Sequence, residues 1–458
     1  MSRTLFSEFD PVSEKEWKQK IQFDLKGADY NDLLIHETLE GIDIKPFYHK
    51  DSISTPLTVI HPESWKIAEI IRSSNPQECI NEAAIAIEKG VESLHFTLHE
   101  LPTALLKSLK ETKKVIDIHF FLKNTGKEIR NSFERLEDVP KNWYFYSDPI
   151  GDLSHSGNWR NTQKEDFDDL EEFLKIRSKT NRYLSINSSI YQNAGANCVQ
   201  QVAYALAHVH EYIHYFKNTN ETLNNDLKFL FKVSIGSNFF MEISKIRAIR
   251  MLFEILAKEY NLLKKCYIFA QPSKRNKSIL DYNVNILRTT TECMSAVLGG
   301  ADIVANNAYD LIYQEKNEFS EHIARNQLHI LKEECYFDQV ETIANGSYYI
   351  EELTKQISEK ALSLFKDLEK SGGLMAHLKK GTIQQKIKEN ARKEQELIDT
   401  GKLKMVGANS FKNREAFLPI SKTVIKTRKN KVKTIITPIK NSRLSEKLEK
   451  KTIFEGKI

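Results

Sequence analysis

Two histidines flank a glutamate in the segment His210-Glu211-Tyr212-Ile213-His214, which has the spacing of a zinc-peptidase motif. On a helix, residues at positions i and i+4 share one face, so both imidazoles would lie beside the Glu211 carboxylate. A zinc peptidase also needs a third ligand, for which Glu242 is the candidate. The simpler interpretation is that His210 and His214 are packing or surface residues of a helix.

Other polar residues are expected at or beyond the ends of predicted strands. They are His95 and His99, Asp148 with Gly151 and Asp152, and the pair Asn306-Asn307. Asp, Asn and Gly are the residues that strand-to-helix turns and helix caps require. We therefore predict loop or capping roles for this set, with the lining of a residual pocket as the alternative. The sequence contains no glycine-rich loop with the spacing of a nucleotide-binding motif.

Eight short runs rich in β-branched and aromatic residues alternate with helical patterns and would position these side chains. The runs cover residues 65–71, 92–98, 115–122, 142–148, 182–189, 231–237, 266–272 and 302–308. The helical patterns are clearest at residues 76–89, 166–178, 197–216, 238–260 and 285–298. This alternation predicts an α/β fold of the TIM (β/α)8 barrel type, in which chemistry takes place at the carboxyl ends of the strands.

Segments on both sides extend the predicted barrel. We expect residues 1–60 to form an N-terminal arm, residues 61–410 the barrel with the helices that follow it, and residues 411–458 a basic, partly disordered tail. The net charge of the whole chain is +5, whereas residues 422–458 alone carry +9. The basic run at residues 426–433 would fit an acidic partner or a phosphate, but such runs are typical of solvated tails, and we predict no nucleic-acid site.

Cysteine usage and hydropathy predict the compartment. The five cysteines have no paired spacing, the N-terminal residues include early acidic side chains, and no apolar run approaches the length of a membrane span. These features predict a cytoplasmic protein with no membrane partner.

Residues 236–250, Gly-Ser-Asn-Phe-Phe-Met-Glu-Ile-Ser-Lys-Ile-Arg-Ala-Ile-Arg, resemble a segment of the methylmalonyl-CoA mutase family. Further matches follow in the same order as in that family, among them Ala-Gly-Ala at 194–196, Leu-Arg-Thr-Thr at 287–290 and Gly-Ser-Tyr-Tyr at 346–349. The family interconverts methylmalonyl-CoA and succinyl-CoA with adenosylcobalamin. Its substrate domain is a TIM barrel, so the resemblance implies the fold that the strand pattern predicts.

Departures from the family's catalytic members fall in the expected active site. Those members carry a Tyr-His pair just before the Ala-Gly-Ala turn, where this sequence has Ser189-Ile190. They also carry a His two residues before a Gln, and here Phe269 stands two residues before Gln271. Phe and Ile cannot donate a hydrogen bond or a proton. The resemblance therefore implies no catalytic residue in this chain, and Gln271 either is a residual substrate-binding residue or satisfies a backbone group.

Cobalamin binding marks another departure. Catalytic members ligate cobalt through the His of an Asp-x-His-x-x-Gly motif in a C-terminal domain. Asp117-Ile-His119 begins in this way, but Leu122 stands at the glycine position and the segment is predicted to be a barrel strand. We therefore expect no cobalamin-binding domain, no bound cofactor and no metal on this chain, and a structural role for His119.

The resemblance implies a small, non-catalytic subunit of a heterodimeric mutase. A large catalytic subunit would bind adenosylcobalamin and the CoA thioester, and the N-terminal arm would contact it. The alternative is an acyl-CoA-binding, mutase-like enzyme that uses a separate cobalamin subunit. An open polar channel around Gln271 would favour the alternative, whereas a barrel filled by Phe269, Ile190 and their neighbours would favour the first hypothesis.

Overall fold

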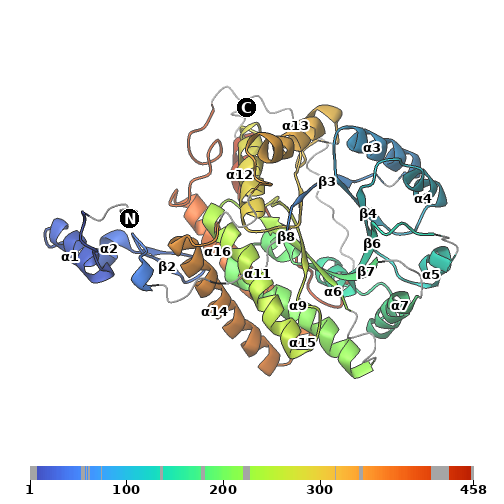
Figure 1. Cartoon of the computed structure of the whole chain (residues 1–458), viewed down its shortest axis with the longest axis horizontal. Coiled ribbons are helices and arrows are strands. Elements are labelled where there is room, and N and C mark those ends of the chain that lie inside the picture. The colour runs from blue at the N-terminus through green and yellow to red at the C-terminus, as the bar shows by residue number, and fades with distance from the viewer. Residues whose placement is uncertain are drawn as a thin grey trace, which may run out of the picture.

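The computed structural model describes residues 8–52, 57, 59, 62–73, 75–134, 138–176, 181–219, 227–314, 316–339, 344–413 and 433–454. Its central element is a closed barrel of eight parallel strands (Figure 1). The strands are β3 Lys66–Ile71, β4 Ser93–Leu98, β5 Asp117–Leu122, β6 Trp143–Ser147, β7 Asn181–Asn187, β8 Phe229–Ile235, β9 Tyr267–Pro272 and β10 Ile303–Ala305. Each strand pairs with its neighbours in sequence, and β10 closes the ring against β3. The predicted TIM barrel is confirmed, and each strand overlaps one of the eight predicted runs.

Helices surround the strands on the outside of the ring (Figure 1). They are α3 Pro76–Glu88, α4 Thr103–Lys110, α5 Lys127–Glu134, α7 Gln163–Lys175, α9 Cys198–Thr219, α11 Phe239–Glu259, α12 Val284–Leu298 and α13 Glu318–His329. Two short helices, α6 Pro149–Ser156 and α8 Ser189–Ala194, follow β6 and β7 directly. After the barrel come the π-helix η2 Ile330–Glu334 and the helices α14 Tyr348–Lys370, α15 Gly373–Lys380, α16 Thr382–Asp399 and α17 Glu446–Phe454. None of the helices within the described ranges is long and apolar enough to cross a membrane.

An N-terminal segment extends away from the barrel on one side (Figure 1). It contains α1 Glu14–Asp24, α2 Tyr30–Leu34, the two-stranded sheet of β1 His36–Glu37 and β2 Asp43–Ile44, and the 3-10 turn η1 Lys50–Ser52. Ser13 and Glu16 form a capping box that starts α1, yet this helix buries none of its residues. The segment touches the barrel where the Asn197 side chain donates to the Leu39 carbonyl, at 2.9 Å.

The charged residues of segment 236–250 are buried on α11. The Lys245 ammonium donates to the Ser234 carbonyl at 2.7 Å and to the Gln192 and Gln201 side chains. Arg250 donates to the carbonyls of Gly300 and Cys266, close to the amino ends of the strands. Buried charges persist only when they are paired and hydrogen-bonded. This segment therefore fastens α11 to the rest of the barrel.

The segment 433–449, which we call the C-terminal strap, lies across the carboxyl end of the barrel. The Ile439 amide donates to the Ser154 carbonyl at 2.8 Å, and the Leu444 amide donates to the Arg275 carbonyl at 2.9 Å. Ile436, Ile439 and Leu444 are buried. These apolar side chains dock the strap on the barrel, although the positive charge of the tail alone would predict a solvated segment. Residues 426–432 of the basic run lie outside the described residues.

Candidate functional site

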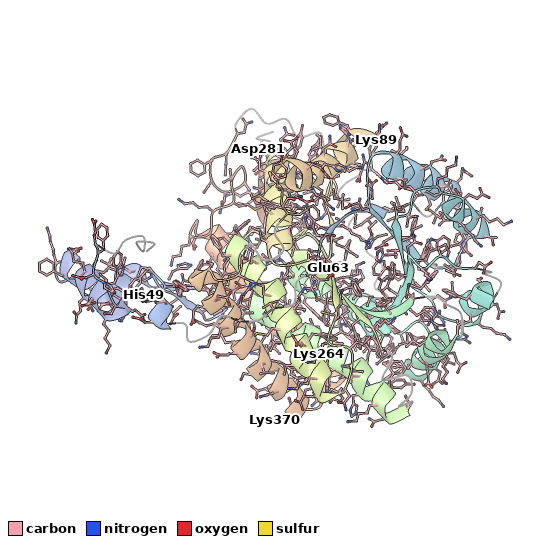
Figure 2. The ribbon with its side chains drawn as sticks, in the orientation of Figure 1. His49, Glu63, Lys89, Lys264, Asp281 and Lys370 are labelled. Atoms are coloured by element: carbon pink, nitrogen blue, oxygen red, sulfur yellow. The ribbon has the colours of Figure 1, made fainter. Side chains whose placement is uncertain are left out.

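Side chains from the strands project into the interior of the barrel (Figure 2), and aromatic and aliphatic residues pack together there. The inward-facing residues of the strands form one buried cluster, which consists of Ala68, Phe121, Tyr146, Tyr183, Leu230, Phe269, Ile303 and Ala305. Phe269 is only 1% exposed. Side chains of this size close-pack the interior of an eight-stranded barrel. The centre of the ring is therefore a packed core.

Two imidazoles lie inside this core. His95 on β4 and His119 on β5 stack with their ring centroids 4.4 Å apart, and His95 also stacks on Phe269 at 4.3 Å. The prediction that His95 lies at a strand end was wrong, since it occupies the middle of β4. Its Nε2 contacts the Ser93 hydroxyl at 3.1 Å, and His119 Nδ1 contacts the Tyr146 hydroxyl at 2.8 Å.

Burial controls the charge of both imidazoles. It lowers the pKa of His119 to about 3 and holds the pKa of His95 well below its ordinary value. Both rings are therefore neutral at physiological pH. Two ring nitrogens, His95 Nδ1 and His119 Nε2, have no hydrogen-bond partner among the described residues.

The sequence-predicted site residues separate into two environments. Gln271 is partly exposed and shares the inner face of β9 with Phe269. Ser189 and Ile190 begin α8, because β7 ends at Asn187. Ile190 is buried in the main core between strands and helices, away from the cluster that contains Phe269. Ile190 and Phe269, the two apolar residues at the family's catalytic positions, therefore belong to separate buried clusters.

Asp148 organises the turn after β6. It caps α6 by accepting from the Gly151 amide at 2.8 Å, and it also accepts from His208 Nε2 at 2.9 Å and the Tyr212 hydroxyl at 2.8 Å. Burial acts to raise the pKa of Asp148, but His208 and the hydrogen bonds from the Gly151 and Asn187 amides lower it below its usual value. The predicted capping role is confirmed. His208 was not predicted because a lone histidine within a helix carries no recognisable spacing.

The His-Glu-x-x-His segment lies on α9, at the flank of the barrel. His210 Nδ1 pairs with Glu369 at 2.8 Å, and its Nε2 contacts the Tyr260 hydroxyl at 2.7 Å. Glu211 accepts from the Met375 amide at 2.8 Å, and His214 Nε2 contacts Asn218 at 3.1 Å. No group of three or more His, Cys, Asp or Glu side chains suited to a metal ion is found in the described part of the chain.

We expect the purified protein to contain far less than stoichiometric zinc, because both nitrogens of His210 already have protein partners. Metal analysis after extensive dialysis checks this. The double substitution His210→Ala and His214→Ala should leave the zinc content unchanged. One equivalent of zinc that disappears in the double variant would contradict the packing interpretation.

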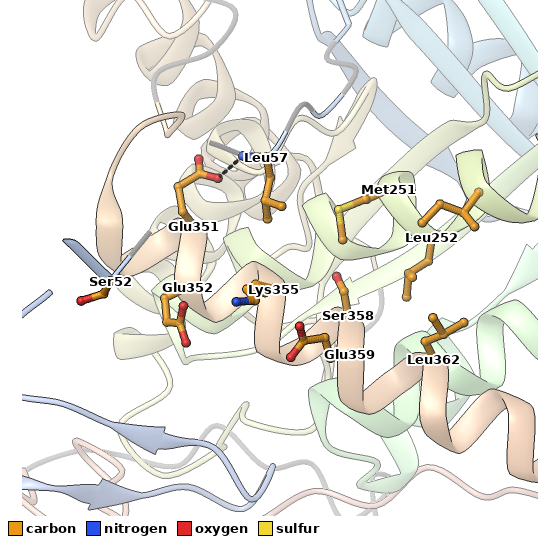
Figure 3. A pocket seen from close by; sticks show the side chains of 11 residues that line it. Ser52, Leu57, Met251, Leu252, Glu351, Glu352, Lys355, Ser358, Glu359 and Leu362 are labelled. Carbon is orange, nitrogen blue, oxygen red and sulfur yellow. Dashed lines mark hydrogen bonds between the residues drawn. The ribbon is translucent and has the colours of Figure 1, made fainter. Parts of the chain in front are cut away.

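A pocket of about 390 Å³ lies on another flank, between α11 and α14 (Figure 3). Its apolar side chains include Met251, Leu252 and Leu362, and its polar rim includes Glu352 and Lys355. The pocket is remote from the carboxyl ends of the strands, where a TIM barrel places its chemistry.

Comparisons with known proteins identify relatives of this chain. The family model described as methylmalonyl-CoA mutase matches residues 145–453. The chain is 32% identical over 453 residues to the methylmalonyl-CoA mutase small subunit of Porphyromonas gingivalis, covering 89% of this chain and 71% of that protein. It is 34% identical over 252 residues to the methylmalonyl-CoA mutase of Cereibacter sphaeroides, covering 53% of this chain but only 35% of that longer protein.

Among solved structures, a dihydropteroate synthase from Coxiella burnetii resembles the chain with a TM-score of 0.32 and 10% identity. That likeness covers 67% of this chain and 99% of the synthase, and it says nothing about function.

Proposed function

This chain belongs to the methylmalonyl-CoA mutase family, and from that premise we propose that it is the small, non-catalytic subunit of a heterodimeric, adenosylcobalamin-dependent methylmalonyl-CoA mutase. A large partner subunit would bind the cofactor and the CoA thioester and would carry out the isomerisation. This chain would act as a scaffold that stabilises the partner by binding it.

The filled barrel is the observation that carries the proposal. A mutase active site must hold a carboxylate and a thioester with fixed polar groups. In this barrel Phe269 and the surrounding aromatic residues occupy the interior, and burial keeps His95 and His119 neutral. The same packing argues against the alternative enzyme, because buried side chains fill the barrel at the level of Phe269, next to Gln271 on β9.

Among the described residues, His119 does not fit as a ligand of adenosylcobalamin. His119, the one histidine in a sequence context similar to the cobalt-binding motif, lies inside the barrel at 2% exposure. Its ring is stacked against Tyr144 at 4.8 Å and against His95. No cofactor could reach this ring without disrupting the core. We therefore assign the cofactor to the partner.

The N-terminal arm, residues 1–60, is our candidate for the partner contact. Its described part exposes several large apolar side chains, namely Phe9, Val12, Trp17, Phe23 and Leu33. Several exposed apolar groups within one segment are typical of protein interfaces. Because the arm extends away from the barrel, it can lie against a second chain without disturbing the barrel (Figure 1).

Co-expression with a candidate large subunit tests the proposal. We expect the two chains to co-purify and the pair to isomerise methylmalonyl-CoA when adenosylcobalamin is added. This chain alone should show no turnover, and turnover by the isolated chain would refute the non-catalytic assignment.

The arm can be tested in the same assay. Trp17→Ser combined with Phe23→Ser should weaken the complex about ten-fold or more, because buried aromatic anchors dominate interface energies. Val115→Ser is the matched control, since Val115 is also exposed and apolar but precedes β5 on the barrel. Equal weakening by both variants would argue against the arm as the contact.

A further inference from the structure

Lys232 lies on the inner face of β8, at the middle of the strand. It is in register with Asn187 on β7 and Phe269 on β9. Its ammonium lies 4.0 Å from the centre of the Phe121 ring and 5.6 Å from the centre of the Phe269 ring. The side chain is partly exposed, so it is not sealed inside the core. Lys232 therefore places an amine on an aromatic floor at the mouth of the barrel.

The mouth of the barrel is open to solvent beside β4 and β9. Thr97 on β4 is in register with Phe121 and therefore shares the inner face, yet it is exposed. Gln271 is also partly exposed on the inner face of β9. A small molecule can thus approach the amine from the carboxyl ends of the strands.

Lys232 has no counter-ion in the described part of the chain. No ion pair or hydrogen bond of its ammonium is found there. Its nearest acidic groups have other partners, because Asp148 accepts from His208 and Tyr212, and Asp152 pairs with Lys123. Its other titratable neighbours are Lys123, which is a cation, and His95 on β4, which is neutral.

We propose that Lys232 is a nucleophilic amine and a site of covalent acylation by acyl thioesters. A lysine that is desolvated on apolar surface and lies near another cation has a larger fraction of neutral amine, which is the nucleophile. Burial lowers the pKa of Lys232 to about 8, and the charge of Lys123 adds to this effect. The proposal rests on the proposed function, because that function places this chain beside a subunit that handles thioesters.

The reaction balances without a further reactant. The neutral Nζ of Lys232 attacks the thioester carbonyl, an amide C–N bond forms and the C–S bond breaks. The leaving thiolate takes up the proton that the amine loses. A dicarboxylic acyl group such as succinyl would replace the positive charge of Lys232 with a negative charge at the barrel mouth.

In the experiment, the purified full-length chain reacts with the succinyl thioester of N-acetylcysteamine. Peptide mass spectrometry then measures the rate of acylation at each lysine. At pH 7.5 a pKa near 8 in place of 10.5 raises the neutral fraction about 200-fold, and the lower basicity of the amine offsets part of this gain. We expect Lys232 to react about ten-fold faster than the exposed Lys107 on α4, with half-maximal rate near pH 8. A rate no faster than that of Lys107 would overturn the proposal.

Two variants test whether Lys232 reacts because its neighbours activate the amine or only because the amine is exposed. Lys123→Gln removes the neighbouring cation and frees Asp152, so it should slow acylation of Lys232 several-fold. Lys127→Gln removes an exposed lysine on α5 and should leave the rate unchanged. If a variant does not fold, the rate ratio and pH profile of the unmodified chain still decide the question. A failure of acylation in a chain that co-purifies with a large subunit would reject this inference and leave the proposed function intact.

Discussion

Replacing Arg247 with methionine is expected to lower the free energy of unfolding by about 3–5 kcal/mol. Arg247 is fully buried on α11 and donates to Glu351 on α14 at 2.6 Å, and Glu351 is 2% exposed. The guanidinium also donates to the Thr354 hydroxyl at 3.2 Å and to the Asn345 side chain. Methionine fills similar volume but leaves the Glu351 carboxylate buried without its counter-ion. The amide of Leu57 would still donate to Glu351 (Figure 3). The amide of Gly346 would do the same, which limits the loss.

Urea unfolding followed by circular dichroism measures this effect. A double variant with methionine at both 247 and 351 should lose less than the sum of the two single variants, because it removes both charges together. Arg392→Met is the matched control, since Arg392 pairs with Glu396 on the exposed face of α16. Arg247→Met and Arg392→Met variants of equal stability would show that the buried pair does not hold α11 against α14.

The second large effect is a loss of stability on mild acidification. His95 and His119 have lowered pKa values in the folded state, with His119 at about 3, whereas an unfolded histidine has a pKa of about 6.5. The unfolded chain therefore binds more protons, and the stability that the neutral rings provide is complete above about pH 6.5 and is lost as the pH falls toward 3. Between pH 7 and pH 5 the His119 ring should cost about 2 kcal/mol, and His95 should add a loss in the same direction.

Urea midpoints at several pH values test this, with phenylalanine substitutions that preserve an aromatic ring. In the His119→Phe variant the loss of unfolding free energy on acidification should be smaller by about the amount that one ring contributes. Adding His95→Phe should make this loss smaller still. His36→Phe should change nothing, because His36 is exposed on β1. An unaltered pH dependence in the His119→Phe variant would mean that the ring is not buried as a neutral group.

The strands were predictable because each is a short apolar run bounded by turn residues, as β5 and β9 illustrate. The inward position of His95 was not predictable, since the strands of a parallel barrel are buried on both faces and their sequences do not distinguish the two. Lys232 carried no signal for a related reason, because a charged residue within a strand is expected to face solvent. The docked strap was missed because its charge obscured the few apolar residues that anchor it.

The family resemblance of segment 236–250 reflects the fold and says nothing about catalysis. It identified the family correctly, yet its charged residues, including Lys245, Arg247 and Arg250, all hold α11 in place. The resemblance in this segment therefore reflects a shared fold. The inference about catalysis depends on other positions, namely Ser189, Ile190 and Phe269.

The strap also bears on how the molecule refolds. Most neighbouring strands are adjacent in sequence, whereas the Ile435 amide bonds to the Asn158 side chain across 277 residues. Long-range pairings form slowly, because the entropy of closing the loop is lost before the contact compensates for it. We expect the strap to dock after the ring has closed, as a late and slow kinetic phase that hydrogen exchange at Ile435 and Ile439 would reveal.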